Sequence, residues 1–210
     1  IKRDRATSSI CTTQVLLAVM AGMYAVHHGP EGIRQLARRI HNHTLTLYNG
    51  LFKLGIDVSN ITFFDTLQIN CLTGVVQKEA LSRGVNLNII DNHRLSISIN
   101  ELTTGSDIEE LIDIFSSSKT TSLKVPLEPI GIPTSMQRST PYLTQEVFYN
   151  YQSESSLMRY IKKLERKDLS LTHSMIALGS CTMKLNAAAE LLPLSRPEWG
   201  NIHPFAPLDQ

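Results

Sequence analysis

The sequence has few cysteines, and their spacing suits neither disulfides nor a metal. Cys11, Cys71 and Cys181 are odd in number, widely separated and never arranged as Cys-x-x-Cys. Small secreted domains held by disulfides carry an even, dense set, and thiolate zinc sites use closely spaced pairs. The cysteines therefore argue against both classes and favour a reducing compartment.

An excess of one charge and a long apolar run are also lacking. The 20 Lys and Arg nearly balance the 19 Asp and Glu, which leaves a formal charge of +1 and no basic stripe for a phosphate backbone. The longest apolar stretch, residues 15–26, is interrupted by Gly22 and is shorter than the ~20 residues that a membrane span needs. We expect no nucleic-acid or membrane partner, and we expect residues 15–26 to lie in a buried helix.

The sequence does have enough apolar residues to form a hydrophobic core, since they make up 42% of its 210 residues. Residues 12–28 are almost wholly apolar and end at Gly29-Pro30, which predicts a helix packed on several sides and closed by that break. Apolar residues then recur at helical spacing through Leu54, and Gly55 can end this second helix in a left-handed cap. The chain begins at Ile1 without a leader, and we expect it to be cut from a longer protein.

The next elements follow the order β-α-β-β-α. The pattern predicts a strand in 62–71, a helix over 74–83, a hairpin over 85–99 and a helix opened by a capping box at 106–109. The predicted fold class is α/β, with helices on one face of a mixed sheet. Such an architecture hosts many functions and decides none of them.

Residues 116–145 are rich in Ser and Pro and predict an extended linker. Ser153 is a suitable cap for a helix that runs through Leu164. A short apolar run at 173–178, a Gly turn and a helical stretch over 185–192 complete the chain.

The turn at 179–184, Gly-Ser-Cys-Thr-Met-Lys, carries the most chemistry, because exposed backbone N–H groups, hydroxyls and a thiol at a helix start can bind an anion. A plain helix cap followed by a solvated lysine is the commoner explanation of such a turn. Lys184 is expected to be a surface residue rather than a covalent cofactor anchor, since nothing around it suppresses its charge.

Other candidate residues also have an ordinary alternative. Four histidines, His27, His28, His41 and His43, have neither the helical spacing nor the nearby carboxylate of a metal site, so no metal is expected. Cys11 stands at the expected start of the first helix, where the helix dipole lowers a thiol pKa, although small buried cysteines are common. His203 could place an imidazole beside an aromatic cofactor, and a surface proline turn explains it equally well.

Seven stretches, spread over nearly the whole chain, occur in the order of one known family: ATSSICT (6–12), YAVHHGP (24–30), FFDTL (63–67), LERKDLSL (164–171), HSMI (173–176), GSCTMKLN (179–186) and NIHPFAPLDQ (201–210). Together they resemble the P-protein family of the glycine cleavage system, the glycine decarboxylases. The resemblance implies two fused aminotransferase-like halves of pyridoxal-phosphate fold type I, of which only the second binds the cofactor. It further implies a homodimer that decarboxylates glycine and passes the aminomethyl group to a lipoyl-bearing H-protein.

Within that scheme residues 1–120 resemble the small C-terminal α/β domain of the first half, 121–152 a linker, and 153–210 the entry into the cofactor-binding half. Ser180, Cys181, Thr182 and His203 are implied near the cofactor or the glycine carboxylate, and Cys11 is implied as a redox-sensitive cysteine. The family's cofactor lysine follows a His and precedes a glycine-rich stretch. No such segment occurs here, so we expect the lysine downstream and the chain alone to be inactive.

The sequence departs from the family pattern at four places. Gln152 stands where His is usual, Ala177 where Pro is usual and Ser9 where Asn is usual. The usual Trp-Pro-Glu-Phe is replaced by Arg-Pro-Glu-Trp, which begins at Arg196. These departures put full activity of the parent protein in doubt. Residues 1–5 and 37–42 resemble animal members most, which implies the mitochondrial matrix, or the cytoplasm if the source is bacterial. The alternatives are a non-catalytic dimerising scaffold of the same fold and, less well supported, a cysteine desulfurase.

Overall fold

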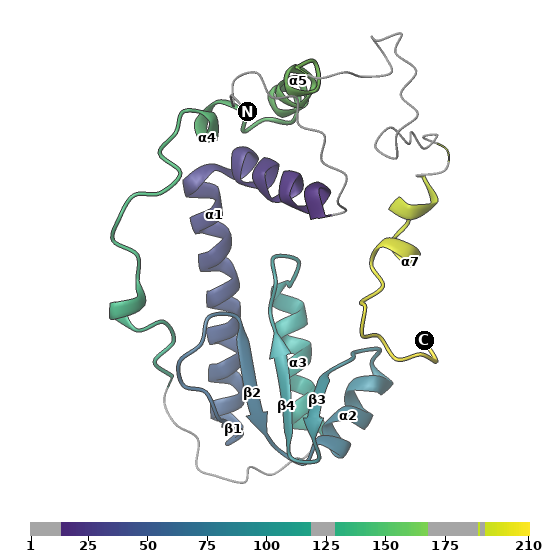
Figure 1. Ribbon diagram of the computed structural model, residues 1–210. Coiled ribbons are helices and arrows are strands. Elements are labelled where there is room, and N and C mark those ends of the chain that lie inside the picture. Colours follow the sequence, from purple (N-terminus) through teal and green to yellow (C-terminus); the bar gives the residue numbers. More distant parts are fainter. Residues whose placement is uncertain (1–13, 119–128, 168–188, 190–191) are drawn as a thin grey trace. The chain divides into compact units, whose positions relative to one another are not determined.

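The structure is a computed structural model, and it describes residues 14–118, 129–167, 189 and 192–210 (Figure 1). Contacts divide the chain into two compact units. Unit 1 comprises Ile1–Pro30 and Leu143–Gln210, and unit 2 comprises Glu31–Tyr142. The chain is α/β, and unit 2 contains the sheet.

Helix α1 spans Gln14–Lys53, but its backbone leaves the helical region at Gly29, where φ is 61° and ψ is −178°. The chain thus has two helices joined at Gly29-Pro30, as predicted. The second one ends where expected, because Gly55 has a φ of 75°. The N–H groups of Gly55 and Ile56 donate to the carbonyls of Phe52 and Leu51, both at 2.9 Å, which is a Schellman cap.

Unit 2 holds a four-stranded sheet in the order β1-β2-β4-β3: β1 is Asp57–Val58, β2 is Thr66–Asn70, β3 is Asn88–Asp91 and β4 is Arg94–Ser98. Every pairing is antiparallel, so the predicted mixed sheet is wrong. The physical reason is that β4 follows β3 after a two-residue turn and lies between β2 and β3. Strands β2 and β3, the one pair that could have been parallel neighbours, are therefore separated. Strand β1 was not predicted, since two residues carry no periodicity.

The core of unit 2 lies on one face of this sheet. Leu67 and Ile69 of β2 and Leu95 of β4 are fully buried, and they share one cluster with residues of α1, of α2 (Thr73–Ser82) and of α3 (Gly105–Ser117). The opposite face is polar and linked across strands: the hydroxyls of Thr66 and Ser98 lie 2.9 Å apart. All three helices therefore cover a single face of the sheet, as predicted.

The start of α3 differs from the prediction by two residues. Thr104, not Ser106, is the N-cap: its side chain accepts from the N–H of Asp107, whose carboxylate accepts from the N–H of Thr104 at 2.8 Å. Thr104 and Asp107 have the three-residue spacing of a capping box, whereas Ser106 lies inside the first turn. The N–H and the hydroxyl of Thr104 lower the pKa of the Asp107 carboxyl.

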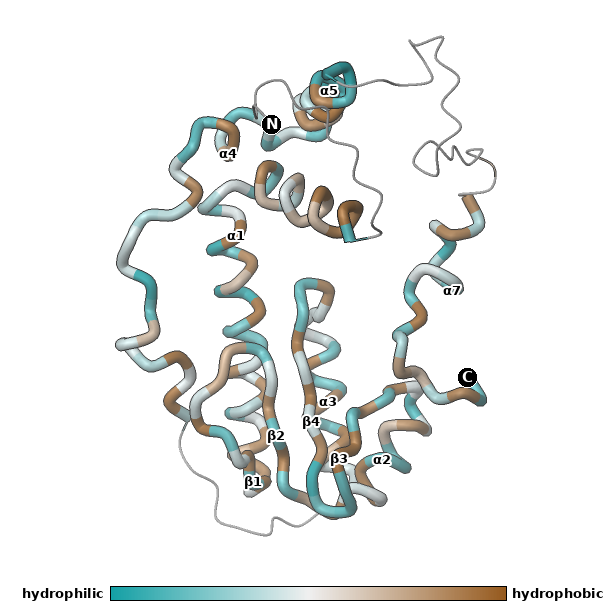
Figure 2. Tube along the Cα trace, viewed as in Figure 1, coloured by the Kyte–Doolittle hydropathy of each residue, from teal (hydrophilic) through white to brown (hydrophobic). Residues whose placement is uncertain are grey.

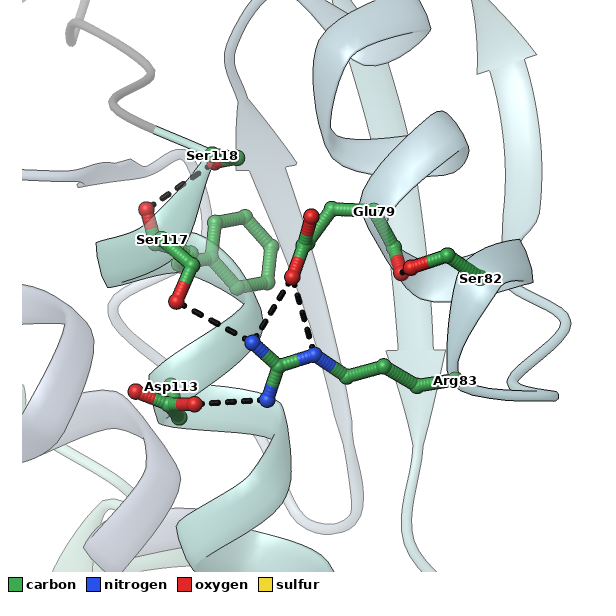
Figure 3. A network of polar contacts seen from close by, with 7 residues as sticks. Glu79, Ser82, Arg83, Asp113, Ser117 and Ser118 are labelled. Carbon is green, nitrogen blue, oxygen red and sulfur yellow. Dashed lines mark hydrogen bonds and ion pairs between the residues drawn. The ribbon is translucent and has the colours of Figure 1, made fainter.

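Arg83, the C-cap of α2, joins α2 to α3 (Figure 3). Its guanidinium donates to Glu79 of its own helix at 2.7 and 2.9 Å, and to Asp113 at 2.5 Å and Ser117 at 3.0 Å on α3. The hydrogen bonds to Asp113 and Glu79 raise the pKa of Arg83. The planar guanidinium directs N–H groups from three separate nitrogens toward Glu79, Asp113 and Ser117, an arrangement that the single ammonium nitrogen of a lysine does not reproduce.

The predicted linker is described from residue 129 onward, and its first residues pair with residues 61–63 inside unit 2. The N–H of Ile130 donates to the Ile61 carbonyl at 2.8 Å, and the N–H of Phe63 donates to the Gly131 carbonyl at 3.2 Å. Short helical turns follow at η2 (Thr134–Met136) and α4 (Val147–Asn150). Helix α5 spans Glu154–Glu165 and is capped by Ser153, as predicted; η3 (Pro193–Ser195) and α7 (Pro197–Gly200) follow.

The first segment of α1, residues 14–28, is helical as predicted but not packed on several sides. Leu16, Leu17 and Met20 are 65%, 66% and 57% exposed, and only Val26 is buried. Figure 2 shows this segment largely in white to brown, with few hydrophilic residues. The expected burial is wrong for this chain, because an apolar helix is buried only where a second surface covers it, and the described residues of unit 1 do not supply one.

Candidate functional site

Most of the predicted site residues belong to segments outside the described part of the chain. Cys11, Ser180, Cys181 and Thr182 lie outside the described residues, as does Lys184. His203 is the one predicted site residue that the structure describes. Its geometry is therefore the only direct observation on the predicted cofactor site.

His203 lies on an exposed turn after α7. Its carbonyl accepts from the N–H of Ala206 at 2.9 Å, and Pro204 stands at the second position of this turn, where its fixed φ is favourable. The His203 Nδ1 accepts from the N–H of Phe205 at 3.1 Å. In the neutral ring this hydrogen bond assigns the proton to Nε2, so His203 offers an N–H donor at Nε2.

The surroundings of His203 are apolar and uncovered. Its ring centroid is 5.8 Å from that of Phe205, which is 89% exposed, and Trp199 and Ile202 nearby are 68% and 59% exposed. Large apolar side chains crowded on a short segment mark a surface that another surface covers. A donor within such a surface becomes strong once water is removed from around it.

A second group of aromatic residues occupies the end of the first segment of α1. The rings of Tyr24 and His28 have centroids 4.3 Å apart, and those of His27 and His28 lie 5.0 Å apart and edge to face. Burial, and then the neighbouring His27, lower the pKa of His28, which favours the uncharged imidazole. Nδ1 of His27 is buried without a hydrogen-bond partner in the part of the chain that the structure describes.

These histidines directly precede the kink at Gly29, where α1 packs against other residues of unit 1. A Cβ at Gly29 would lie 2.7 Å from the Phe148 carbonyl oxygen and would collide with Nε2 of Gln152. Gln152, which replaces the expected His, donates to the Phe148 carbonyl at 3.1 Å. The sequence analysis considered His27 and His28 only as metal ligands and assigned them no other role. The one signal that they matter was their position in YAVHHGP, a stretch that resembles the family.

Two further observations limit what the described residues can do. Cys71 is fully buried in the core of unit 2, and burial raises the pKa of its thiol to about 11, so it is not a reactive thiolate. Among the residues that the structure describes, no three His, Cys, Asp or Glu side chains come together as metal ligands. Within the same residues no helix is long and apolar enough to span a membrane.

Comparison with known proteins places the chain among larger relatives. The family model described as glycine cleavage system P-protein matches residues 1–115. A glycine dehydrogenase (decarboxylating) of Flavobacterium johnsoniae is 52% identical over 213 residues, which cover all of this chain and 22% of that protein. Proteins of the same name with the added word mitochondrial, from Solanum tuberosum and Mus musculus, are each 46% identical, over all of this chain and 21% of their own length.

The chain thus spans about a fifth of the length of the curated relatives it matches. The identity to the bacterial protein is higher than that to the mouse protein. These identities refer to the whole chain, whereas the expected resemblance to animal members concerned residues 1–5 and 37–42 alone.

Proposed function

This chain belongs to the glycine cleavage system P-protein family, and we propose from that premise that it is part of a glycine decarboxylase that uses pyridoxal phosphate. In the proposed reaction glycine loses carbon dioxide, and its aminomethyl group passes to the oxidised lipoyl arm of an H-protein. One sulfur of the lipoyl disulfide takes the aminomethyl group, and the other is reduced to a thiol. The parent protein would act as a homodimer. The observation that carries the proposal is identity of 46–52% along the whole chain to proteins named glycine dehydrogenase (decarboxylating).

We propose further that the parent has two aminotransferase-like halves of pyridoxal-phosphate fold type I. Residues 1–120 would be the small domain of the first half, 121–152 the linker, and 153–210 the entry into the second half. The small antiparallel sheet with helices on one face supports the first assignment. Contacts within this chain divide it at Pro30 and Tyr142 instead, so limited proteolysis of the parent should locate the boundaries.

Ser180, Cys181, Thr182 and His203 are proposed as hydrogen-bond donors toward the cofactor or the glycine carboxylate. His203 fits such a role, because its Nδ1 is occupied by the Phe205 N–H and its Nε2 is left as a donor on an apolar surface. Pyridoxal phosphate, when bound, supplies the electron sink for the carbanion that decarboxylation leaves. The contribution of this chain is to bind and orient: no His-Lys pair occurs in it, so the covalent lysine is proposed downstream.

Cys11 is proposed as a redox-sensitive cysteine, in contrast to the inert Cys71. The compartment would be the mitochondrial matrix for a eukaryotic source and the cytoplasm for a bacterial one. The relatives from Solanum tuberosum and Mus musculus are named mitochondrial, which supports the first of these only as far as the organelle.

The test compares this chain with the full-length parent. The parent should bind pyridoxal phosphate with the visible absorption of a lysine-bound cofactor and release carbon dioxide from glycine only when lipoyl H-protein is present. The chain alone should do neither. In the parent, His203→Phe, which keeps an aromatic ring but has no N–H donor, should reduce kcat/KM by about ten- to a hundredfold, the range for a lost donor to a charged group.

Two results would contradict the proposal. One is a parent that binds no cofactor, and the other is a chain that binds it covalently by itself, which would return attention to Lys184. A tight dimer of the isolated chain, seen by light scattering, together with an inactive parent would favour the scaffold alternative.

A further inference from the structure

The first segment of α1 presents an apolar face that nothing described in unit 1 covers. The face consists of five exposed large side chains, Leu16, Leu17, Val19, Met20 and Tyr24. At about 100° per residue they fall within an arc of roughly 160° of the helix circumference. No residue between Gln14 and Val26 is charged.

We propose that this face, the 16–24 face, is a docking surface for a part of the same polypeptide that lies beyond these 210 residues. The inference rests on the chain's being part of a longer P-protein, and not on the proposed reaction. About four fifths of the length of the matched relatives lies outside this chain, so ample polypeptide exists to cover the face.

The width of the face argues against a second copy of this chain as its cover. A helix that pairs with one other helix shows a narrow seam of apolar residues, whereas a helix facing a core shows a stripe of 100° or more. An arc of roughly 160° therefore needs a covering surface built from more than one element. The interior of a larger domain provides such a surface.

A membrane is also a poor match for the face. Fifteen residues of helix are about 22 Å long, which is shorter than the ~30 Å hydrocarbon core. A helix that lies in the membrane interface carries Lys or Arg along its polar side. Residues 14–28 contain neither.

The test measures how fast a cysteine at the centre of the face reacts with a maleimide. Met20→Cys is placed in this chain and in the full-length parent, and labelling is followed peptide by peptide with mass spectrometry, so that the native cysteines are read separately. Glu109→Cys, at an exposed charged position on α3, is the matched control. Hydrogen exchange of residues 14–28 in the unsubstituted proteins provides a second measurement that needs no variant.

We expect Met20→Cys to react as fast as Glu109→Cys in the isolated chain and at least about tenfold more slowly in the parent, because the site must first open. Glu109→Cys should react equally fast in both, and amides of residues 14–28 should be protected only in the parent. Equal labelling of Met20→Cys in both proteins would overturn the proposal. Protection of residues 14–28 in the isolated chain that disappears on dilution would also overturn it, because a second copy would then be the cover. Protection that appears only with lipid vesicles would overturn it too, because a membrane would then be the cover.

This outcome is independent of activity. A parent that protects Met20→Cys but has no decarboxylase activity would keep the docking surface and remove the proposed function. An active parent with a freely labelled Met20→Cys would do the reverse.

Discussion

The Cα of Gly29 lies so close to Phe148 that a Cβ at position 29 would be 2.7 Å from the Phe148 carbonyl oxygen. The two residues are far apart in sequence, and both belong to unit 1. The contact joins the kink of α1 to α4, and the Gln152 side chain completes it by donating to the same carbonyl. The kink is therefore part of the packing of unit 1 and not a loose joint.

The first prediction follows from this contact: Gly29→Ala should destabilise unit 1. The backbone at position 29 has a φ of 61°, which is costly for any residue with a Cβ, and the added methyl group would collide with Phe148 and Gln152. We expect a loss of about 1–3 kcal/mol, measured by urea unfolding and by faster hydrogen exchange in residues 14–28.

Gly22→Ala is the matched control on the same helix. A Cβ there would meet nothing within 4 Å, and the backbone is helical. Alanine in a helix interior should stabilise the segment by up to about 1 kcal/mol relative to glycine. Equal effects of the two substitutions would show that the contact between Gly29 and Phe148 contributes nothing.

A second glycine sets the approach of α1 to α3. A Cβ at Gly50 would collide with Cδ1 of Ile112 and lie 2.6 Å from its Cγ1. Gly50→Ala should therefore destabilise unit 2 by about 1–3 kcal/mol through overpacking, despite the better helix propensity of alanine. Ile112→Val, which removes Cδ1, should recover part of that loss in a double-mutant cycle monitored by urea unfolding. Additive effects of the two changes would contradict direct contact.

The two helices around Gly29-Pro30, the cap at Gly55 and the cap of α5 at Ser153 could be predicted from sequence, because each depends on neighbours a few residues apart. The contacts of Gly29 and Gly50 could not, since they depend on Gln152 and Ile112, which lie far along the chain. The exposure of Leu16 and Leu17 could not be predicted either. An apolar pattern shows that a helix face must be covered, but it does not show which polypeptide covers it.

The candidate site was predicted only in part. The sequence predicted that His203 could lie beside an aromatic cofactor, and that stays a prediction. The contact with the Phe205 ring and the hydrogen bond that makes Nε2 a donor depend on how Pro204 turns the backbone. The ring contact between Tyr24 and His28 follows from their four-residue spacing on one helix, so this contact could have been predicted from the sequence.

Acid stability should depend on the cap of α3. The Thr104 N–H and hydroxyl lower the pKa of the Asp107 carboxyl, so the folded state holds its proton less tightly than the unfolded state. The resulting stabilisation is complete above the unfolded value of about 3.9 and is lost as the pH falls through the folded pKa. Asp107→Asn keeps an acceptor oxygen but does not titrate, so its unfolding midpoint should change less between pH 5 and pH 2. An unaltered acid dependence would place the effect on other carboxylates, such as Asp91, whose pKa the His93 N–H and Arg94 also lower.

Cys71 should behave as an inert thiol, which its position at the end of β2 explains. Burial raises its pKa to about 11, so almost no thiolate exists at pH 8, and the sulfur is shielded from reagents. Peptide-resolved labelling with iodoacetamide should leave Cys71 unmodified in the native chain and modify it fully in urea. Because the folded pKa is above the unfolded value, the thiol's contribution to stability is present below pH 8.5 and declines as the pH rises from about 8.5 toward 11. Cys71→Ala removes that decline, and rapid native labelling of Cys71 would show instead that the core opens beside β2.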